Sequence, residues 1–341
     1  MENYLNKSIN DRIDELIDLQ GDSNKKIVFT VGNTRVSDSS SYYLTPIRFI
    51  DNLLISGIVL FSETEGSIVF NLLDGKVDFI FVDCEKKSKN NKSGFFNIER
   101  LSVELINKSK LYFYKGNDVT VDSIDSFIFQ FYKSSNQLLG GKNILVVGIG
   151  NVGFKIALKL VERGVNVFLK SRDYSKAKLL ADTINLIKPS ETISNVKVYS
   201  TDQEYNTVIL SHLKPLIDND DIVNSLHTGS LIIDVGKGCL TNNQINLLND
   251  KNVVSYRLDI GETFINQIKV TLSGIKKFNI PKSKKLSIGY SIIEPGIIGK
   301  ENDVVVDSIE NPKVIYGICN GIGGLKTNIN KSEIFKEIRN E

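Results

Sequence analysis

Residues 141–153, GKNILVVGIGNVG, give the strongest indication of the fold in this sequence. The apolar run ILVV has the length and composition of a buried strand. It leads into the pattern Gly-x-Gly-x-x-Gly at Gly148, Gly150 and Gly153, and FKIALKLVERG continues with the spacing of an amphipathic helix. A glycine-rich turn between a strand and a helix is typical of a domain that binds a dinucleotide.

Each residue of this turn has its own expected role. Gly148 permits a tight turn, Gly150 lets the backbone approach a pyrophosphate, and Gly153 lets the helix pack against the strand. Asn151 and Val152 open the helix, where backbone N–H groups and a partial positive charge attract phosphate. We predict that these five residues bind the pyrophosphate.

The end of the next strand, expected over 165–170, indicates which dinucleotide binds. An NAD site usually carries Asp or Glu there, but this sequence has Lys170, Ser171 and Arg172. Both basic side chains can pair with a 2′-phosphate and Ser171 can donate to it, whereas Asp173 suits the N-cap of the following helix. The sequence therefore favours NADP(H) as cofactor over NAD(H).

The segment SRDYSKAKLLADTIN (171–185) resembles the second-strand motif of shikimate dehydrogenases and glutamyl-tRNA reductases. That motif is Asn-Arg-Thr followed by Lys-Ala and Leu-Ala, and Ser171, Arg172 and Asp173 fall on the Asn-Arg-Thr. The resemblance implies NADP selectivity, with Arg172 stacking on adenine and binding the 2′-phosphate.

The approach LLGGKNILVVGIGNVG, together with Ile-Asp-Val-Gly at 233–236, resembles methylene-tetrahydrofolate dehydrogenases. The resemblance implies that Gly236 lies against the nicotinamide. These families join an N-terminal α/β catalytic domain to a C-terminal Rossmann domain, as this chain is expected to do. The resemblance covers about residues 120–260 at the level of motifs and is only architectural for 20–120.

The sequence departs from these families in its first half. The Tyr-x-x-x-Lys helix of the folate enzymes has no equivalent, since no lysine follows Tyr42 or Tyr43 at that spacing. Gly32-Asn33-Thr34 and the serines of 37–40 echo the substrate segment of shikimate dehydrogenases without its proline, and the Lys–Asp catalytic pair is not identifiable. The resemblance therefore extends to the cofactor site and not to the substrate.

Strand-like and helix-like segments alternate along the chain, which predicts an α/β fold. We expect an N-terminal α/β substrate domain (1–125), a doubly wound Rossmann domain (126–270) and a mixed C-terminal extension packing on the body (271–341). The expected strands are 25–31, 55–61, 67–73, 77–83, 110–116, 143–148, 165–170, 197–200, 207–211, 230–236, 253–259, 285–293, 303–309 and 313–319. The expected helices include 2–20, 45–54, 96–108, 119–136 and 331–341.

Ligands of such sheets bind at the carboxyl ends of the strands, and this rule selects the candidate catalytic groups. Ser211 and His212 follow a strand, so Ser211 is assigned to the cofactor and His212 to protonation of a carbonyl oxygen, although a surface or capping role is open for the histidine. Lys237, between two glycines, is either a ligand for a substrate carboxylate or a solvated turn residue. Arg257 and Asp259 are expected to form an ion pair, and His227 precedes a strand and is assigned a structural role.

The N-terminal half offers further candidates. Asp83, Glu85 and Lys86 follow the strand at 77–83, and this lysine beside carboxylates is either an acid–base group or part of a surface cluster. The loop 37–43, after Thr30, Asn33 and Arg35, suits a carboxylate or polyol, or only caps the helix expected at 45–54. Arg48 on that helix can orient a substrate but cannot act as a base.

The composition excludes several classes of function. In 341 residues, 42 Lys and Arg oppose 40 Asp and Glu, and a net charge of +2 is too small to collect nucleic acid or an anionic membrane. Two histidines and three scattered cysteines predict no metal site and no disulfide framework. The first twenty residues lack a signal-peptide pattern and no 18-residue apolar stretch occurs, so we expect a cytoplasmic protein.

We therefore predict an NADP(H)-dependent dehydrogenase or reductase of a biosynthetic pathway. Hydride would pass between the nicotinamide and a small polar metabolite held between the two domains, and alcohol–ketone and amine–imine chemistry both remain open. A small-molecule substrate is the expected partner, and assembly as a homodimer is open. The alternative is a non-catalytic sensor or scaffold that binds NADP(H) without turnover.

Overall fold

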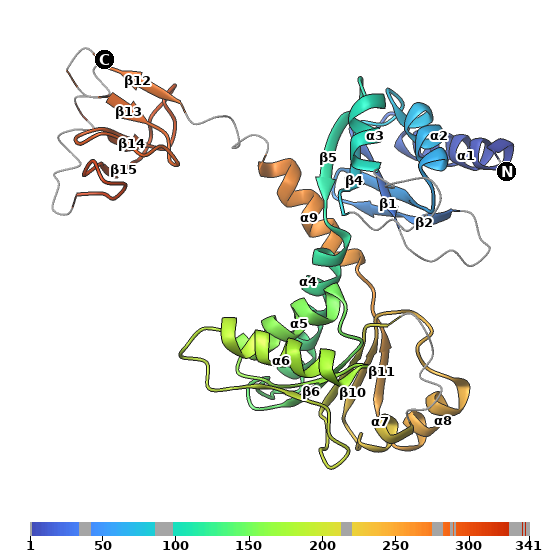
Figure 1. Cartoon of the computed structure of the whole chain (residues 1–341). Helices are drawn as coiled ribbons and strands as arrows, with labels where there is room; N and C mark the ends of the chain where they lie inside the picture. Colours follow the sequence, from blue (N-terminus) through green and yellow to red (C-terminus); the bar gives the residue numbers. More distant parts are fainter. Residues whose placement is uncertain are drawn as a thin grey trace. The chain divides into compact units, whose positions relative to one another are not determined.

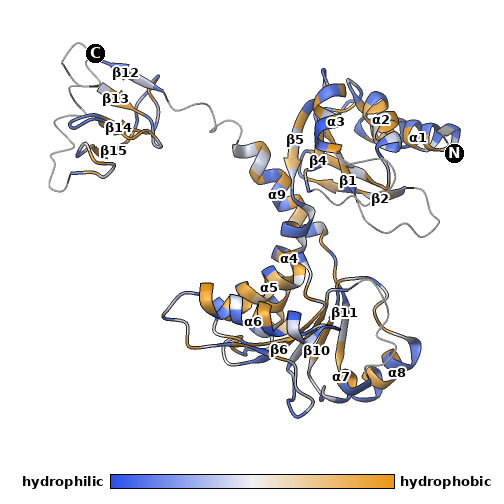
Figure 2. Ribbon diagram, in the orientation of Figure 1, coloured by the Kyte–Doolittle hydropathy of each residue, from blue (hydrophilic) through white to orange (hydrophobic). Residues whose placement is uncertain are grey.

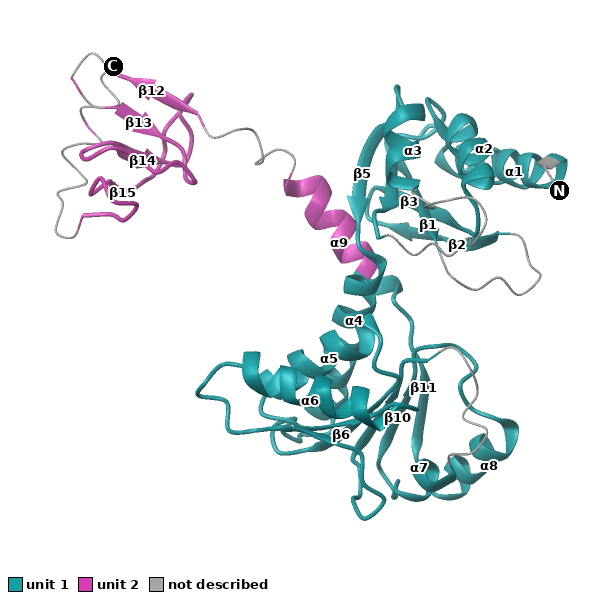
Figure 3. Ribbon diagram, in the orientation of Figure 1, with its two compact units in different colours: residues 1–263 teal, residues 264–341 magenta. Residues whose placement is uncertain are grey.

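The computed structural model describes residues 2–33, 42–85, 98–212, 220–274, 282–286, 289, 291–326, 336 and 338 (Figure 1). The chain divides into two compact units, residues 1–263 and 264–341 (Figure 3). The first unit contains two separate sheets, each with its own hydrophobic core. The further division of this unit near residue 125 stays a prediction.

The N-terminal sheet has the strand order β2-β3-β1-β4-β5. Strands β3, β1, β4 and β5 run parallel, and only the edge strand β2 is antiparallel. The elements are α1 (Glu2–Gln20), β1 (Lys26–Asn33), β2 (Tyr43–Ile50), β3 (Leu53–Leu60), α2 (Glu63–Leu73), β4 (Phe79–Asp83), α3 (Ile98–Leu105), β5 (Lys110–Tyr114) and α4 (Gly116–Ser134). The predicted helices at 2–20, 96–108 and 119–136 are confirmed, as are strands near 25–31, 55–61, 77–83 and 110–116.

Helices α1, α2 and α3 share one hydrophobic core with this sheet. Helix α1 contributes Leu5, Ile9, Ile13 and Leu16, whose spacing of three or four residues places them on one face. Every second residue of β1, from Ile27 to Val31, faces the same core, and the strands are correspondingly hydrophobic in Figure 2.

The helix predicted at 45–54 is wrong, because these residues form strand β2 and the turn into β3. Ile50 pairs with Leu53, so Asp51 and Asn52 make a two-residue hairpin turn, with Asp51 at a φ of 50°. Such turns need positive φ, which Asp tolerates better than most residues. Pro46 fits because β2 is an edge strand whose register shifts between Thr45 and Arg48.

The strand predicted at 67–73 is also wrong, because this segment is the second half of α2. Ser62 accepts a hydrogen bond from the Glu65 N–H while the Glu65 carboxylate accepts from the Ser62 N–H, which is a capping box. The pattern Ser-x-x-Glu at 62–65 is a helix-start signal that outweighs the β-branched composition of Ser67–Leu73.

The second sheet has the order β11-β10-β9-β6-β7-β8, with every pair parallel. Counted from β6 this is the order 3-2-1-4-5-6 of the Rossmann fold. Its strands are β6 (Asn143–Val147), β7 (Asn166–Lys170), β8 (Val196–Val198), β9 (Thr207–Leu210), β10 (Leu231–Asp234) and β11 (Val254–Arg257). All six predicted strands of this sheet are confirmed, and so is the predicted doubly wound α/β fold.

Helices cover both faces of the second sheet. Helices α4, α5 (Asn151–Glu162) and α6 (Tyr174–Ile187) pack on one face. Helices α7 (Asp220–Asn224) and α8 (Asn242–Asp250) pack on the other. The whole β6–α5 turn is therefore carried by a scaffold that is buried on both sides.

Helix α4 is tied to α5 by a ladder of ion pairs. Asp118 contacts Lys155, and Asp122 contacts Lys159 at 2.6 Å. Three residues further along, the Asp125 carboxylate accepts two hydrogen bonds from the Arg163 guanidinium, each 2.7 Å long. Spacings of three and four residues put each set of charges along one helix face. Helix α4, which follows the last strand of the N-terminal sheet, is thereby anchored to α5.

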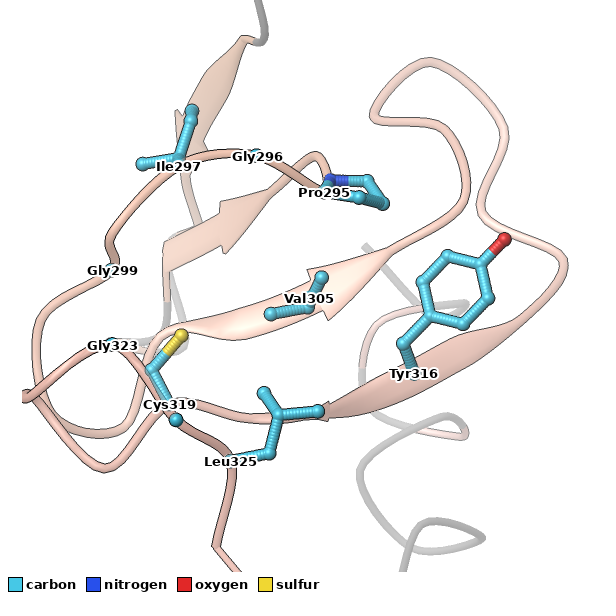
Figure 4. Close-up of a pocket in the computed structure, with 10 residues that line it drawn as sticks. Pro295, Gly296, Ile297, Gly299, Val305, Tyr316, Cys319, Gly323 and Leu325 are labelled. Carbon is cyan, nitrogen blue, oxygen red and sulfur yellow. The ribbon is translucent and has the colours of Figure 1, made fainter. Parts of the chain in front are cut away.

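The C-terminal unit holds a small sheet of order β12-β13-β14-β15. Helix α9 (Gly261–Gly274) precedes β12 (Ser283–Lys285), β13 (Ser291–Ile293), β14 (Val304–Val306) and β15 (Ile315–Ile318), and the helix expected at 331–341 lies almost wholly outside the described residues. Pro295, Val305, Tyr316, Cys319 and Leu325 line an open, largely apolar cavity of about 470 Å³ (Figure 4). Strands expected near 303–309 and 313–319 are confirmed, and the single strand expected at 285–293 is two short strands.

Candidate functional site

The glycine-rich turn joins β6 to α5 with no room for a side chain at two of its glycines. Gly148 has a φ of 90°, which L residues rarely adopt, and a Cβ there would stand 3.0 Å from that of His212. A Cβ on Gly153 would stand 2.2 Å from the Gly148 carbonyl oxygen. The close helix–strand packing that the sequence predicts at Gly153 is therefore present.

Gly150 differs from the other two glycines because the space beside it is open. It is the N-cap residue of α5, and nothing lies within 4 Å of the position that its Cβ would occupy. Among the described residues, no side chain caps this helix. The helix that begins with Asn151 and Val152 thus starts at a residue with open space beside it, and the first N–H groups of a helix are the groups that can bind a pyrophosphate.

Ser211 and His212 follow β9, the strand beside β6 at the point where the strand order reverses. The Ser211 hydroxyl donates to the Gly148 carbonyl oxygen, and the His212 backbone lies against Gly148. Both residues therefore border the same turn. Their assignments to cofactor binding and to proton transfer stay predictions.

The turn after β10 closes against His212. A Cβ on Gly236 would stand 1.7 Å from the His212 carbonyl oxygen, which itself accepts a hydrogen bond from the Cys239 thiol at 2.8 Å. The buried Asp234 carboxylate accepts three backbone N–H groups of residues 237–239 and holds this turn in shape. Lys237 is exposed, with a φ of 61°. Gly236 thus packs against His212, which itself borders the glycine-rich turn, and Lys237 follows Gly236 in the chain.

The end of β7 carries the residues predicted to select NADP(H). Arg172 is exposed and, within the described part of the chain, makes no ion pair. The Ser171 hydroxyl oxygen accepts the Asp173 N–H at 3.3 Å, and Asp173 caps α6 as predicted. Arg172 and Ser171 are thus available to a phosphate beside this strand end.

Lys170 contacts Tyr199, a residue that the sequence did not indicate as part of the site. Its ammonium lies 3.9 Å from the centre of the Tyr199 ring, and desolvation lowers the pKa of Lys170. Tyr199 follows β8, and because Leu169 pairs with Val198 the two strand ends are neighbours. The strand order 3-2-1 of the Rossmann fold was the signal that could have found Tyr199.

The ion pair predicted between Arg257 and Asp259 is wrong for the part of the chain that the structure describes. Asp259 instead contacts Arg48 at 3.4 Å and accepts the Gly261 N–H at 2.8 Å. These contacts lower the pKa of Asp259, with the Gly261 hydrogen bond as the largest cause. Strand β11 ends at Arg257, so the strand geometry that places alternate residues on one face does not extend to Asp259. Arg48 lies on strand β2 and not on a helix.

The candidates of the N-terminal sheet gather at the ends of β1, β4 and β5. The Asp83 side chain, 2% exposed, accepts N–H groups of Glu85 and Gly116 and so stabilises the start of α4. Asn33 lies beside it. Lys86, Arg35 and residues 37–41 lie outside the described residues, so the catalytic assignment of Asp83 and Lys86 stays a prediction.

One protein-family model matches the part of the chain that forms most of the second sheet. A family model described as "NADP oxidoreductase coenzyme F420-dependent" matches residues 143–238, from β6 to the turn after β10. No curated protein matches the sequence. Residues 143–238 are thus a Rossmann domain of the type found in pyridine-nucleotide oxidoreductases.

Solved structures match this chain at low identity and low TM-score. Dipicolinate synthase A chain from Bacillus subtilis is 14% identical with a TM-score of 0.36, over 75% of this chain and 80% of that one. L-tryptophan dehydrogenase from Nostoc punctiforme is 14% identical (TM-score 0.43; 73% and 75%). Hetero-hexameric glutamate dehydrogenase from Thermus thermophilus is 11% identical (0.43; 75% and 70%). The fold class rests on the strand order and the turn geometry.

No helix among the described residues is both long and apolar enough to cross a membrane.

Proposed function

We propose that the chain is an NADP(H)-dependent dehydrogenase or reductase that acts on a small polar metabolite. The observation that carries the proposal is the N-terminus of α5, which no side chain of the described residues caps and beside which Gly150 leaves free space. A helix N-terminus at the switch point of a doubly wound sheet is where such folds bind a pyrophosphate.

The preference for NADP(H) over NAD(H) is supported by charge at the end of β7. No acidic residue stands at 170–172, and the exposed Arg172 and the Ser171 hydroxyl can contact a 2′-phosphate. Lys170, held on the Tyr199 ring, adds positive charge beside them. A guanidinium matches phosphate geometry through paired N–H donors, which favours Arg172 as the main contact.

When bound, the nicotinamide would supply or accept the hydride. The chain's own groups would orient it: Ser211 and Gly236 lie beside the turn that begins the site. His212, Lys237, Asp83 and Lys86 remain the proposed groups for proton transfer and substrate binding. Asp83 is occupied by backbone N–H groups, so among these four it is the one whose contacts favour a structural role.

The test is titration of the full chain with NADPH and with NADH, followed by nicotinamide fluorescence. We expect NADPH to bind at least about tenfold more tightly, a difference of about 1.4 kcal/mol. Failure of both nucleotides to bind at millimolar concentration would refute the proposal. A screen of ketones and imines for NADPH consumption then separates an enzyme from a sensor that binds the nucleotide without turnover.

A further inference from the structure

The N-terminal sheet has its own switch point, between β1 and β4. From β1 the chain moves to β2 and β3 on one side, and from β3 it crosses through α2 to β4 and then β5 on the other. In open α/β sheets, ligands bind in the crevice at the carboxyl ends of the two strands where the order reverses. Here those ends carry Asn33 and Asp83.

Asn33 joins the ends of β1 and β4 through its side-chain amide. Its Nδ2 donates to the carbonyl oxygens of Asp83, at 3.4 Å, and Glu85, at 3.2 Å. Two carbonyl acceptors fix which end of the amide is the nitrogen, because oxygen cannot donate to them. The orientation of Asn33 is therefore set by the end of β4.

The other end of the same amide is left without a partner. Asn33 is 6% exposed, and its Oδ1 is buried and accepts no hydrogen bond in the part of the chain that the structure describes. Leaving a buried acceptor unsatisfied costs about 1–3 kcal/mol, and native structures seldom tolerate it. A donor from outside the chain would remove this cost.

The groups around Asn33 show which kind of molecule fits. A Cβ on Gly32 would stand 3.2 Å from the Tyr114 hydroxyl, so that hydroxyl lies against the end of β1. Burial and the nearby Asp83 and Glu85 carboxylates raise the pKa of Tyr114 well above its ordinary value, so it stays protonated. The Asp83 and Glu85 carboxylates are held at the start of α4, where they accept the N–H groups of Gly116 and Asn117.

We propose that the crevice between β1 and β4 binds a small polar molecule that donates an O–H or N–H hydrogen bond to Asn33 Oδ1. Identifying this molecule as the substrate of the reductase rests on the proposed function, whereas binding at the crevice does not. Within the described residues, Asn33 is then the group that selects a hydroxyl- or amino-bearing compound over one without a donor.

The test uses four small probes on the isotope-labelled full chain, observed through backbone amide NMR signals. Glycerol presents O–H donors and methylammonium N–H donors, while 1,2-dimethoxyethane and tetramethylammonium are comparable in size or charge without donors. We expect the first two to shift signals of residues 32–33, 83–85 and 116–117, and the last two not to. The stronger of the two donor probes identifies the donor as O–H or N–H.

Two variants locate the effect. Asn33→Ala should abolish the shifts caused by the donor probes, while Asn10→Ala, an Asn on α1, should retain them. If Asn33→Ala fails to fold, the contrast between probes in the native chain still decides. Equal responses to donor-bearing and donor-free probes, or none to any, would overturn the proposal, and the second result would assign Oδ1 to a water molecule.

The readout also separates this proposal from the proposed function. NADPH binding depends on the β6–α5 turn, so its affinity should be unchanged in Asn33→Ala. If the chain shows the probe shifts but binds no nicotinamide nucleotide, the crevice proposal is supported and the proposed reductase function is refuted. If it binds the nucleotide but shows no probe shifts, the reductase proposal stands and the crevice proposal is refuted.

Discussion

The backbone of Gly153 lies directly against Gly148, since a Cβ on residue 153 would stand 2.2 Å from the Gly148 carbonyl oxygen. That distance is far inside van der Waals contact, and the obstacle is backbone, which cannot move aside without distorting the turn. At Gly150, two residues after Gly148, a Cβ would have no described heavy atom within 4 Å. A side chain is therefore expected to destabilise the fold at Gly153 and to be tolerated at Gly150.

Gly153→Ala should destabilise the fold by about 3 kcal/mol, because overpacking against backbone costs roughly this much. Denaturant unfolding followed by circular dichroism measures the change. Gly141→Ala is not a suitable control, because the φ of 79° at Gly141 would strain an alanine by itself. Ala157→Gly, within the same helix, is the comparison variant: it reports the effect of helix propensity on the free energy of unfolding. A midpoint unchanged from the native chain would show that the turn is loose.

Gly150→Asp should leave the fold intact and remove nucleotide binding. Asp is a better N-cap than Gly, and the φ of −88° at this position suits it, so the free energy of unfolding should stay the same or rise by about 0.5 kcal/mol. The added carboxylate would stand where phosphate is expected, and like charges repel. NADPH fluorescence should show at least about a tenfold loss of affinity. Retained affinity would place the nucleotide elsewhere.

Arg172→Ala should weaken NADPH binding and leave NADH binding nearly unchanged. A charge-assisted hydrogen bond is worth about 1.5–3 kcal/mol, or roughly a tenfold to hundredfold change in Kd. Lys178→Ala removes the same charge from α6, where Lys178 pairs with Asp182, and should change neither affinity. Equal losses for both nucleotides in Arg172→Ala would contradict its role at the 2′-phosphate.

The Cys239 thiol should make stability fall at alkaline pH. Burial, assisted by Asp234, raises the pKa of Cys239 to about 12, whereas the thiol in the unfolded chain titrates near 9.0. The unfolded state therefore loses its proton first, and the folded state loses stability as pH rises from about 9 towards 12, by up to about 1.4 kcal/mol per pH unit. Unfolding at several pH values should show a shallower alkaline decline in Cys239→Ala. Parallel declines would rule out this thiol as the cause.

Ser62→Ala should cost about 1 kcal/mol of unfolding free energy, because it removes the hydroxyl oxygen that accepts a hydrogen bond from the Glu65 N–H. Ser67→Ala lies within the same helix, where the hydroxyl donates only to the Glu63 carbonyl, and should cost less. The two unfolding midpoints provide the measurement. Equal midpoints would mean that tertiary packing alone maintains α2.

Prediction from the sequence succeeded where local and long-range signals agree. The six strands of the second sheet follow apolar runs bounded by turn residues, and the glycine pattern places a helix after the first of them. It failed at 45–54 and 67–73, where composition suggested one structure and the context imposed another. An Asp-Asn hairpin turn decided the first case, and the capping box at Ser62 decided the second.

Three features could be predicted from the sequence: the Rossmann domain, the close packing at Gly153 and a cofactor site without an acidic residue at the end of β7. Each of them depends on residues that are near one another in the chain. Tertiary structure alone decided that Lys170 lies on Tyr199, that Asp259 pairs with Arg48 and that Asn33 spans β1 and β4. These pairs are distant in sequence. Lys170 and Tyr199, like Asn33 and the end of β4, meet because parallel strands bring their carboxyl ends to one edge of a sheet. Arg48 and Asp259 meet because the fold brings β2 of one sheet to the segment after β11 of the other.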